Sequence, residues 1–457
     1  MFNKKILAAS MAAAITTGGM VAQTSAMEVA ANNVGQVLLG GTYFVENSYT
    51  TDLVVVNTRT DAAVMAKVVF RSHKDSAEVL DFMIYLSPGD TWRAKMTTNA
   101  ATGMGHIYSN DDSVRNASDT QWGDVDALDV DLFNSNITDP TDSNTFGHFE
   151  VISSGTAVGT YIAPLPAVTI APGMSKDDVR TLTTNAALRT VVSGGDCFNT
   201  DMPAVDAVDA VSAALPCMTQ LMGEVVIGNG TNRASYRPVA LTAELETPAA
   251  GATLATYVIT NEALLLTSSA VSVIGNPFGD GANLNTDAIN EIEIALAAET
   301  SSYPWESNGT DQGTHVLATF PTKYRHLGDV AGVCGANGAG GRIAGAADKY
   351  SAPFADTTVG EITIAFTNYD NSENTTSTPG NTLSGGSGPS TTTVPDEVNY
   401  LTPTYLTTSE SGWAFYAWAG DATCSYKGVP VATYTYKFES STDFRHMMEK
   451  AANKTNI

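Results

Sequence analysis

The sequence is poor in positive charge and, after its N-terminus, has no long apolar run. It contains 23 Lys and Arg against 48 Asp and Glu among 457 residues, a net charge of −25. Nucleic acid and anionic lipid would be repelled by this charge, which argues against both as partners. The apolar runs are shorter than the roughly 20 residues that a spanning helix needs. The composition therefore predicts neither a nucleic-acid partner nor a membrane-spanning segment.

Motifs of the common enzyme classes are also missing. The six histidines form no His-Glu-x-x-His pair, and no Gly-x-Ser-x-Gly sequence occurs. Residues 335–341 are rich in glycine but lack the Lys-Ser/Thr ending of a phosphate-binding loop. The sequence therefore predicts a protein that is not an enzyme and has no catalytic residues.

A pair of carboxylates is the one catalytic arrangement that the composition leaves open. Glycoside hydrolysis needs only two carboxyl groups, and Glu150 and Glu224 both lie on predicted strands. Outward-facing charge on amphipathic strands explains the same residues. A secreted carboxylate-dependent hydrolase is therefore the least favoured of the functions considered.

The N-terminal segment, residues 1–26, has the order of charge and apolarity of a secretory signal peptide. Lys4 and Lys5 precede a short apolar run, residues 6–14, and small residues at 24–26 suit cleavage. The run is too short for a membrane anchor. We therefore expect an exported protein at the cell surface or outside the cell, with the periplasm as the alternative.

The four cysteines are Cys197, Cys217, Cys334 and Cys424. An even number in an exported chain is typical of disulfide bonds, and no two of them have the spacing of metal ligands. Three pairings exist; position along the chain favours Cys197–Cys217 and Cys334–Cys424. Free thiols and a metal site are the weaker alternatives.

Residues 27–165 have the strand pattern of a β-sandwich. Within one run, Val68 and Phe70 share a face, whereas Lys67 and Arg71 lie on the opposite one. Turn residues separate the runs at the close spacing typical of sandwiches. This spacing predicts an immunoglobulin-like (Ig-like) β-sandwich. The predicted strands are 37–45, 52–57, 64–71, 78–86, 91–96 and, after a long acidic loop, 147–153.

Residues 166–457 predict a larger β-rich domain with one or two short helices. Apolar residues at helical spacing predict a helical insert at 203–215, and 287–299 fits either a helix or a strand. Residues 371–395 are nearly all Ser, Thr, Gly, Asn and Pro, which predicts a disordered loop. A C-terminal helix is expected at 442–453. The predicted strands are 224–227, 315–320, 361–368, 413–418 and 429–438.

Two stretches place oxygen-bearing side chains at close intervals, as Ca²⁺ sites do. Neither has the glycine and closing glutamate of a helix–loop–helix calcium site, and solvated acidic loops are the favoured explanation of both. Residues 285–287 of the second stretch equally suit a helix cap. Calcium is the only cofactor that the sequence suggests. The weak Ca²⁺ candidates are Asp124, Asp126, Asp129 and Asp131, and Asp280, Asn283, Asn285 and Asp287.

An aromatic run at 413–418 offers a surface for stacking sugars. In a strand, Trp413 and Phe415 lie on one side, and Tyr416 and Trp418 on the other. Because one side of a sandwich strand faces the core, we expect at least one of these pairs to be buried.

Four segments in order resemble a group of exported bacterial proteins described only as hypothetical or cell-surface proteins. The resemblance spans most of the chain beyond residue 26. It implies bacterial export and a β-rich body, and it implies no activity and no functional residues. The segments are 78–82 with 86–88 and Trp92, then 147–152, 221–224 and 320–323.

These observations favour a structural or cell-surface protein, such as a self-assembling subunit of a surface layer, filament or matrix. Its partners would be further copies or other surface components. An adhesin or carbohydrate-binding protein that uses the aromatic run is the alternative, with glycans as partners.

Overall fold

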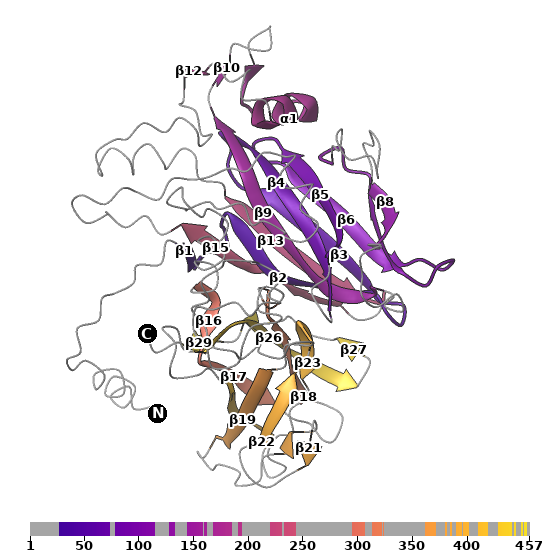
Figure 1. The fold of residues 1–457 in the computed structure, drawn as a ribbon, viewed down its shortest axis with the longest axis vertical. Coiled ribbons are helices and arrows are strands. Elements are labelled where there is room, and N and C mark those ends of the chain that lie inside the picture. Colours follow the sequence, from indigo (N-terminus) through magenta and orange to yellow (C-terminus); the bar gives the residue numbers. More distant parts are fainter. Residues whose placement is uncertain are drawn as a thin grey trace, which may run out of the picture.

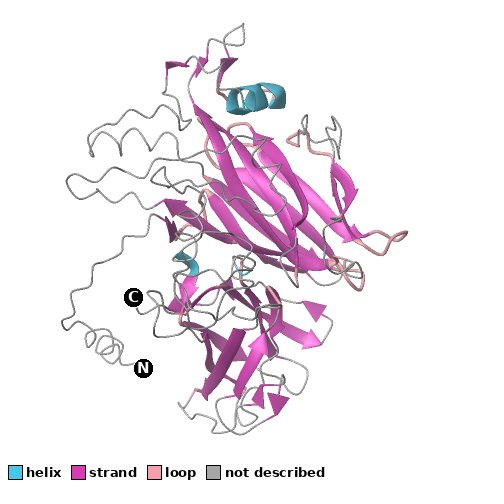
Figure 2. Ribbon diagram, viewed as in Figure 1, coloured by secondary structure: helices cyan, strands magenta, loops and turns pink. Residues whose placement is uncertain are grey.

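The computed structural model is mainly β: 66% of the residues that it describes lie in strands and 5% in helix, which confirms the predicted fold class. The strands form two lobes stacked along the long axis (Figure 1), and Figure 2 shows helix α1 (Lys176–Thr184) at the far end of the first lobe. The residues that the structure describes are 27–73, 78–114, 128–132, 144–158, 160–161, 168–184, 191–193, 220–230, 233–243, 295–306, 313–321, 323, 362–371, 380–381, 384–385, 390–394, 396–401, 410–418, 428–440, 443–444, 449–450 and 452–454.

The first lobe is a sandwich of two six-stranded antiparallel sheets, ordered β1-β15-β2-β9-β4-β5 and β14-β13-β3-β6-β7-β8. Five of its strands coincide with the runs predicted between residues 37 and 96. The strands are β1 (Met27–Val29), β2 (Val37–Phe44), β3 (Thr50–Asn57), β4 (Ala62–Ser72), β5 (Glu78–Leu86), β6 (Thr91–Thr98), β7 (Gly105–Ser109), β8 (Leu128–Asp131), β9 (Phe146–Val158), β13 (Leu221–Gly228), β14 (Arg233–Tyr236) and β15 (Val239–Ala243).

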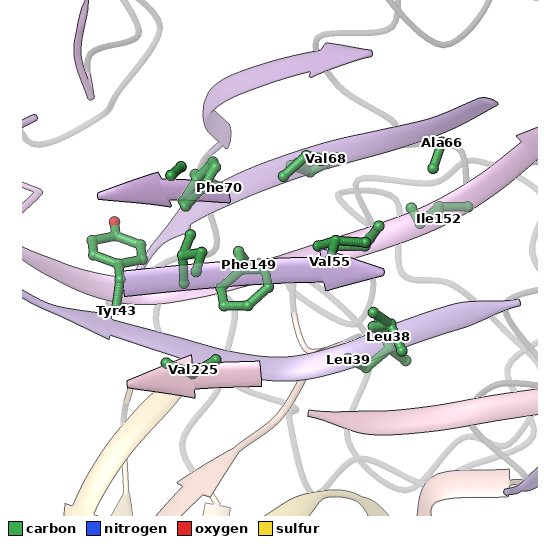
Figure 3. Close-up of a cluster of buried hydrophobic side chains, with 14 of the residues drawn as sticks. Leu38, Leu39, Tyr43, Val55, Ala66, Val68, Phe70, Phe149, Ile152 and Val225 are labelled. Atoms are coloured by element: carbon green, nitrogen blue, oxygen red, sulfur yellow. The ribbon is translucent and has the colours of Figure 1, made fainter. Parts of the chain in front are cut away.

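Apolar side chains from both sheets fill the space between them (Figure 3). The ring of Phe70 lies 5.8 Å from that of Phe149, and Phe82 packs edge-on against Trp92 of the other sheet at 5.5 Å. Trp92 is completely buried. The strand alternation anticipated in β4 therefore places Phe70 in the core.

The boundary of the first lobe differs from the prediction at residue 165. Strand β13 pairs with β3 along its whole length, and β15 lies between β1 and β2. Residues 221–228 and 233–243, assigned from sequence to the second domain, thus complete the first sandwich. Sequence distance hid this, because pairing partners in a sheet need not be neighbours in the chain.

The second lobe is formed by two further antiparallel sheets, β22-β19-β24-β17-β29 and β23-β18-β26-β27, with β28 beside β26. Two short pairs, β16–β25 and β20–β21, accompany them. The strands are β16 (Ala297–Ala298), β17 (Thr300–Glu306), β18 (Gly313–Thr319), β19 (Ile362–Asp370), β20 (Gly380–Asn381), β21 (Ser384–Gly385), β22 (Ser390–Val394), β23 (Val398–Leu401), β24 (Ser411–Trp418), β25 (Val429–Pro430), β26 (Ala432–Ser440), β27 (Asp443–Phe444), β28 (Glu449–Lys450) and β29 (Ala452–Lys454).

Two local predictions in this lobe are wrong. Part of the loop expected at 371–395 is strand β22, which pairs with β19, because the run of Thr suits a pleated edge. The helix expected at 442–453 is instead the short strands β27, β28 and β29, which take unpaired sheet edges. In both cases backbone pairing within the lobe outweighs local composition.

The helix predicted at 203–215 lies outside the described residues, as do residues 287–294 of the helix or strand predicted at 287–299. Within the second range, residues 295–296 are helical and residues 297–298 form β16. The described helix is α1 (Lys176–Thr184), which the sequence did not predict. Ser175 caps it: the Ser175 hydroxyl accepts a hydrogen bond from the Asp178 amide at 3.1 Å. Val179 and Leu182 pack on the outer face of the β4–β5 pair. Near them lies a small sheet of β10 (Thr160–Tyr161), β11 (Val168–Thr169) and β12 (Val191–Ser193).

The two lobes share one apolar core. Leu317, Val398 and Tyr434 of the second lobe belong to the same buried cluster as the interior of the first. The ring of Tyr434 lies 4.8 Å from that of Tyr236, whose hydroxyl donates to the carbonyl of Thr42 at 3.2 Å. Each fully buried side chain of this kind contributes about 1.5–3 kcal/mol. The lobes are therefore packed together as one body.

Among the described residues, no helix is long and apolar enough to cross a membrane.

Candidate functional site

The first cluster of reactive groups is ionic and lies buried where the lobes meet. The guanidinium Nε of Arg71 in β4 is 3.5 Å from Glu150 Oε2 in β9, and His148 Nε2 is 3.6 Å from Glu150 Oε1. The same His148 nitrogen is 2.9 Å from Oε1 of Glu397, which comes from the second lobe. We call Arg71, His148, Glu150 and Glu397 the junction cluster. His148, Glu150 and Glu397 have no exposed surface.

Backbone hydrogen bonds hold Glu397 at this position. The Glu397 amide donates to the carbonyl of His73 at 2.8 Å, which joins the second lobe to the end of β4. The Phe320 amide donates to the Glu397 carbonyl at 2.9 Å from within the second lobe. The carboxylate is therefore presented to His148 by main chain that is anchored on both sides.

The electrostatics of the junction cluster favour a charged histidine. Burial alone would lower the pKa of His148, but the carboxylates of Glu397 and Glu150 outweigh burial and raise that pKa to about 9. Burial also acts to raise the pKa of Glu150, but the Arg71 guanidinium and His148 outweigh it and lower that pKa. For Glu397 burial prevails and raises the pKa. Two cationic groups thus face two carboxyl groups away from water.

A second buried ion pair extends this charged strip along the sheet. Lys67, fully buried in β4, places its ammonium 2.6 Å from Asp81 Oδ2 in β5. Lys67 and Arg71 lie on the opposite face of β4 from Phe70, as the sequence predicts, yet neither is open to solvent. A buried charge is tolerated only when it is paired, and each of these charged groups has an opposite charge within 3.6 Å.

The carboxylates singled out for hydrolysis are not brought together. Phe149 packs into the core, so Glu150 beside it faces the outer side of its sheet, where it belongs to the junction cluster. Glu224 is exposed on β13, in the other sheet of the sandwich. The two residues therefore share no cleft.

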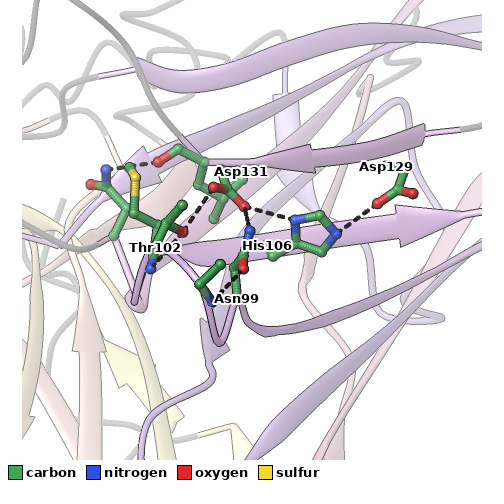
Figure 4. Close-up of polar contacts among 9 residues, drawn as sticks. Asn99, Thr102, His106, Asp129 and Asp131 are labelled. Atoms are coloured by element: carbon green, nitrogen blue, oxygen red, sulfur yellow. Dashed lines mark hydrogen bonds and ion pairs between the residues drawn. The ribbon is translucent and has the colours of Figure 1, made fainter.

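A surface cluster surrounds His106 of β7 (Figure 4). Its Nδ1 lies 2.8 Å from Asp131 Oδ1, and its Nε2 lies 2.8 Å from Asp129 Oδ1. Asp131 also accepts hydrogen bonds from the side-chain Nδ2 of Asn99 at 2.8 Å and from the Thr102 hydroxyl at 2.9 Å. Burial opposes ionisation of Asp131, but these hydrogen bonds outweigh it and lower the pKa of the carboxyl.

The His106 cluster contains two of the residues that the sequence suggested as calcium ligands. Asp129 and Asp131 lie on β8, where His106 lies between their carboxylates. In the part of the chain that the structure describes, no group of three or more His, Cys, Asp or Glu is arranged to hold a metal ion. The remaining candidates, and the four cysteines, lie outside the described residues, so calcium binding and the disulfides stay predictions. Those residues are Asp124, Asp126, Asp280, Asn283, Asn285, Asp287, Cys197, Cys217, Cys334 and Cys424.

The third feature is a row of aromatic rings on the outer face of the second lobe. Trp413 of β24 lies directly opposite Tyr369 of β19, and their rings stack with centroids 4.0 Å apart and 10° between planes. Phe415, two residues along β24, has its ring 5.9 Å from that of Trp413. We call Tyr369, Trp413 and Phe415 the aromatic row. Trp413 is 43% exposed, which is unusual because tryptophan side chains are large and mostly buried.

The opposite side of β24 faces the core of the lobe. Tyr416 and Trp418 are buried, and the Tyr416 ring packs on Phe366 at 5.0 Å. This confirms that at least one of the two aromatic pairs predicted from alternation is buried. Sequence reasoning missed Tyr369 and the junction cluster. An alternating Lys67/Arg71 pattern hinted at the latter, but nothing near Glu397 marks it as their partner.

Comparisons with known proteins add little to this geometry. No protein-family model and no curated protein matches the chain. Among solved structures, one described as "NanB plus Optactamide" is similar at 9% identity with a TM-score of 0.13; the match covers 91% of this chain and 66% of that one. The chain thus spans slightly less than two thirds of that protein, and the similarity is too weak to support any argument.

Proposed function

We propose that the protein is an exported structural protein of the cell surface, a subunit of a surface layer, filament or matrix. The observation that supports this best is the apolar core shared by the two lobes, in which Val398 and Tyr434 join the interior of the first sandwich. A unit with one continuous core resists bending between its lobes, which suits a building block that must hold a fixed spacing. Export is inferred from residues 1–26, and the first sandwich is taken as Ig-like on its strand spacing.

The buried ions support the same proposal. The contact between His148 and Glu397 adds a polar constraint to the apolar one, and its partners are enclosed on all sides. Polar contacts of this kind add specificity to a packing arrangement, since only one alignment of the lobes satisfies them. We therefore expect the angle between the lobes to be a fixed property of the subunit.

Charge is the main obstacle to assembly. At a net charge of −25, copies repel one another, and divalent cations would weaken that repulsion. We therefore propose that self-association depends on calcium or a comparable cation, and that the acidic stretches described above bind it.

Light scattering with negative-stain microscopy tests this proposal on the protein lacking residues 1–26, at high concentration, with and without millimolar calcium. Ordered sheets or fibres that form with calcium and dissolve on chelation are expected. Sodium chloride of matched ionic strength is the control for general screening. A monomer under every condition would contradict the proposal.

A further inference from the structure

We propose that the aromatic row is a binding site for a neutral polysaccharide. This goes beyond the structural role proposed above, because it assigns a ligand and a place for it. A pyranose ring has C–H groups on its faces and hydroxyl groups around its rim. It is therefore recognised by exposed aromatic rings that have uncharged hydrogen-bonding groups beside them. The outer face of the β19–β24–β17 sheet combines these two features.

The strand register determines what surrounds the rings. Pro304 of β17 lies opposite Trp413 on the side away from Tyr369, so three apolar residues cross the sheet in line. One step along the strands, Thr367 and Ser302 flank Phe415. All of these side chains are exposed or partly exposed. A sugar lying across the rings would thus meet hydroxyl groups at its edge.

The other end of the row carries an amide and a hydroxyl group. Asn371 follows β19, and its Nδ2 donates to Ser411 Oγ at 2.8 Å on the solvent side. Asn371 is exposed, so its carbonyl oxygen remains available to a sugar hydroxyl. Glu306, opposite Ser411, is the only charged side chain among the positions named on this face.

The main chain beneath the row is fixed from inside the lobe. The indole Nε1 of the buried Trp305 lies 3.0 Å from the carbonyl oxygen of Tyr369 and 3.2 Å from that of Trp413, bridging both strands of the row. A surface whose rings are already in place loses little conformational entropy when it binds. This arrangement favours a ligand that stacks on a flat, preformed face.

Charge and area argue for a neutral glycan rather than another partner. A net charge of −25 opposes anionic polymers, and it also opposes a second copy of this chain wherever cations do not screen it. An aromatic residue buries about 150–250 Å² at most, and those of the row are already partly covered. The rings alone therefore fall short of the roughly 800 Å² per partner of a stable protein complex. Stacking of one or two sugar units needs far less.

Depletion assays with insoluble cellulose, chitin, starch and mannan, followed by titration with the matching soluble oligosaccharides, test the proposal on the chain lacking residues 1–26. At least one neutral polysaccharide is expected to bind. Trp413→Ala should weaken that binding at least tenfold, and Trp413→Phe should weaken it less. Tyr108→Ala is the matched control: Tyr108 is 47% exposed but lies in the first lobe, and its loss should change binding less than twofold.

Thermal melts show whether the variants fold, and Phe415→Ala repeats the test at a second ring if Trp413→Ala unfolds. Absence of binding to all four polysaccharides would overturn the proposal. Binding that Trp413→Ala and Phe415→Ala leave unchanged would also overturn it. Light scattering on the same variants separates the two proposals: if Trp413→Ala abolishes assembly without any glycan binding by the parent protein, the row is a contact between copies.

Discussion

His148 Nε2 of the first lobe lies 2.9 Å from Glu397 Oε1 of the second, and neither side chain has any surface exposed to water. A backbone hydrogen bond from the Glu397 amide to the His73 carbonyl holds the two lobes together beside this contact. A charged contact in so dry a place makes the alignment of the lobes sensitive to both mutation and pH.

Glu397→Ala is expected to destabilise the protein by about 3–5 kcal/mol, because it leaves the His148 cation buried without its nearest partner. Urea unfolding followed by fluorescence measures this. Glu410→Ala is the control, since Glu410 is exposed and its loss should change the free energy of unfolding by less than about 0.5 kcal/mol. Equal effects of the two substitutions would contradict the importance of the junction cluster.

Stability should fall as the pH rises through the range 6.5 to 9. The pKa of His148 increases from an ordinary 6.5 to about 9 on folding, so its contribution is complete below pH 6.5 and is lost as pH approaches 9. The size of the loss is on the order of 3 kcal/mol. The raised pKa of Glu397 acts in the same direction, because its contribution also disappears as pH rises.

Urea unfolding of the parent protein and of His148→Gln, compared at pH 6 and pH 9, isolates the histidine. The free energy of unfolding should change between pH 6 and pH 9 much less in His148→Gln than in the parent protein. The lowered pKa of Glu150 acts elsewhere: its contribution is present above pH 4.5 and is lost in acid, so both proteins should weaken there. A pH profile that His148→Gln leaves unaltered would rule out His148 as the titrating group.

Gly40→Ala should loosen the contact between the lobes. A Cβ at Gly40 would lie 2.8 Å from Ala432 Cβ, and the residue has a φ of +71° that favours glycine. Gly103→Ala is the control, with a φ of +74° but nothing within 4 Å of the added carbon. Backbone strain alone costs roughly 1–2 kcal/mol. Gly40→Ala should lower the melting temperature measurably more than Gly103→Ala does. Equal decreases would mean that the interface between the lobes accommodates the added methyl group.

Asp131→Ala should free the turn between β6 and β7 without unfolding the sandwich. Asp131 accepts hydrogen bonds from Asn99 and Thr102 and faces His106, and losing these partly exposed contacts costs about 1–2 kcal/mol. Faster amide hydrogen exchange at residues 99–104 is the measurement. Asp129→Ala removes only the outer contact to His106 and should have a smaller effect.

Much of the first sandwich could be predicted from local sequence. Runs such as 64–71 are rich in Val and other apolar residues, and turn residues separate them at the close spacing typical of a β-sandwich. The second lobe was harder. The Thr-rich segment of β22 has no apolar face, and the short strands of the tail carry no strand pattern of their own. Helix α1 has only nine residues and few strong helix formers, and its packing on Met65 and Met83 stabilises it.

The sequence by itself determined the β class, the strong negative charge and the side of each strand on which its residues lie, because these depend on composition and on a period of two residues. Only the tertiary structure decided that the sides carrying Lys67 and Arg71 are buried, and that Glu397 reaches His148 from more than 200 residues away. The same holds for the stacking of Tyr369 on Trp413, which depends on register between strands distant in the chain. Such contacts follow from how sheets pair and how lobes pack, and no local pattern encodes either.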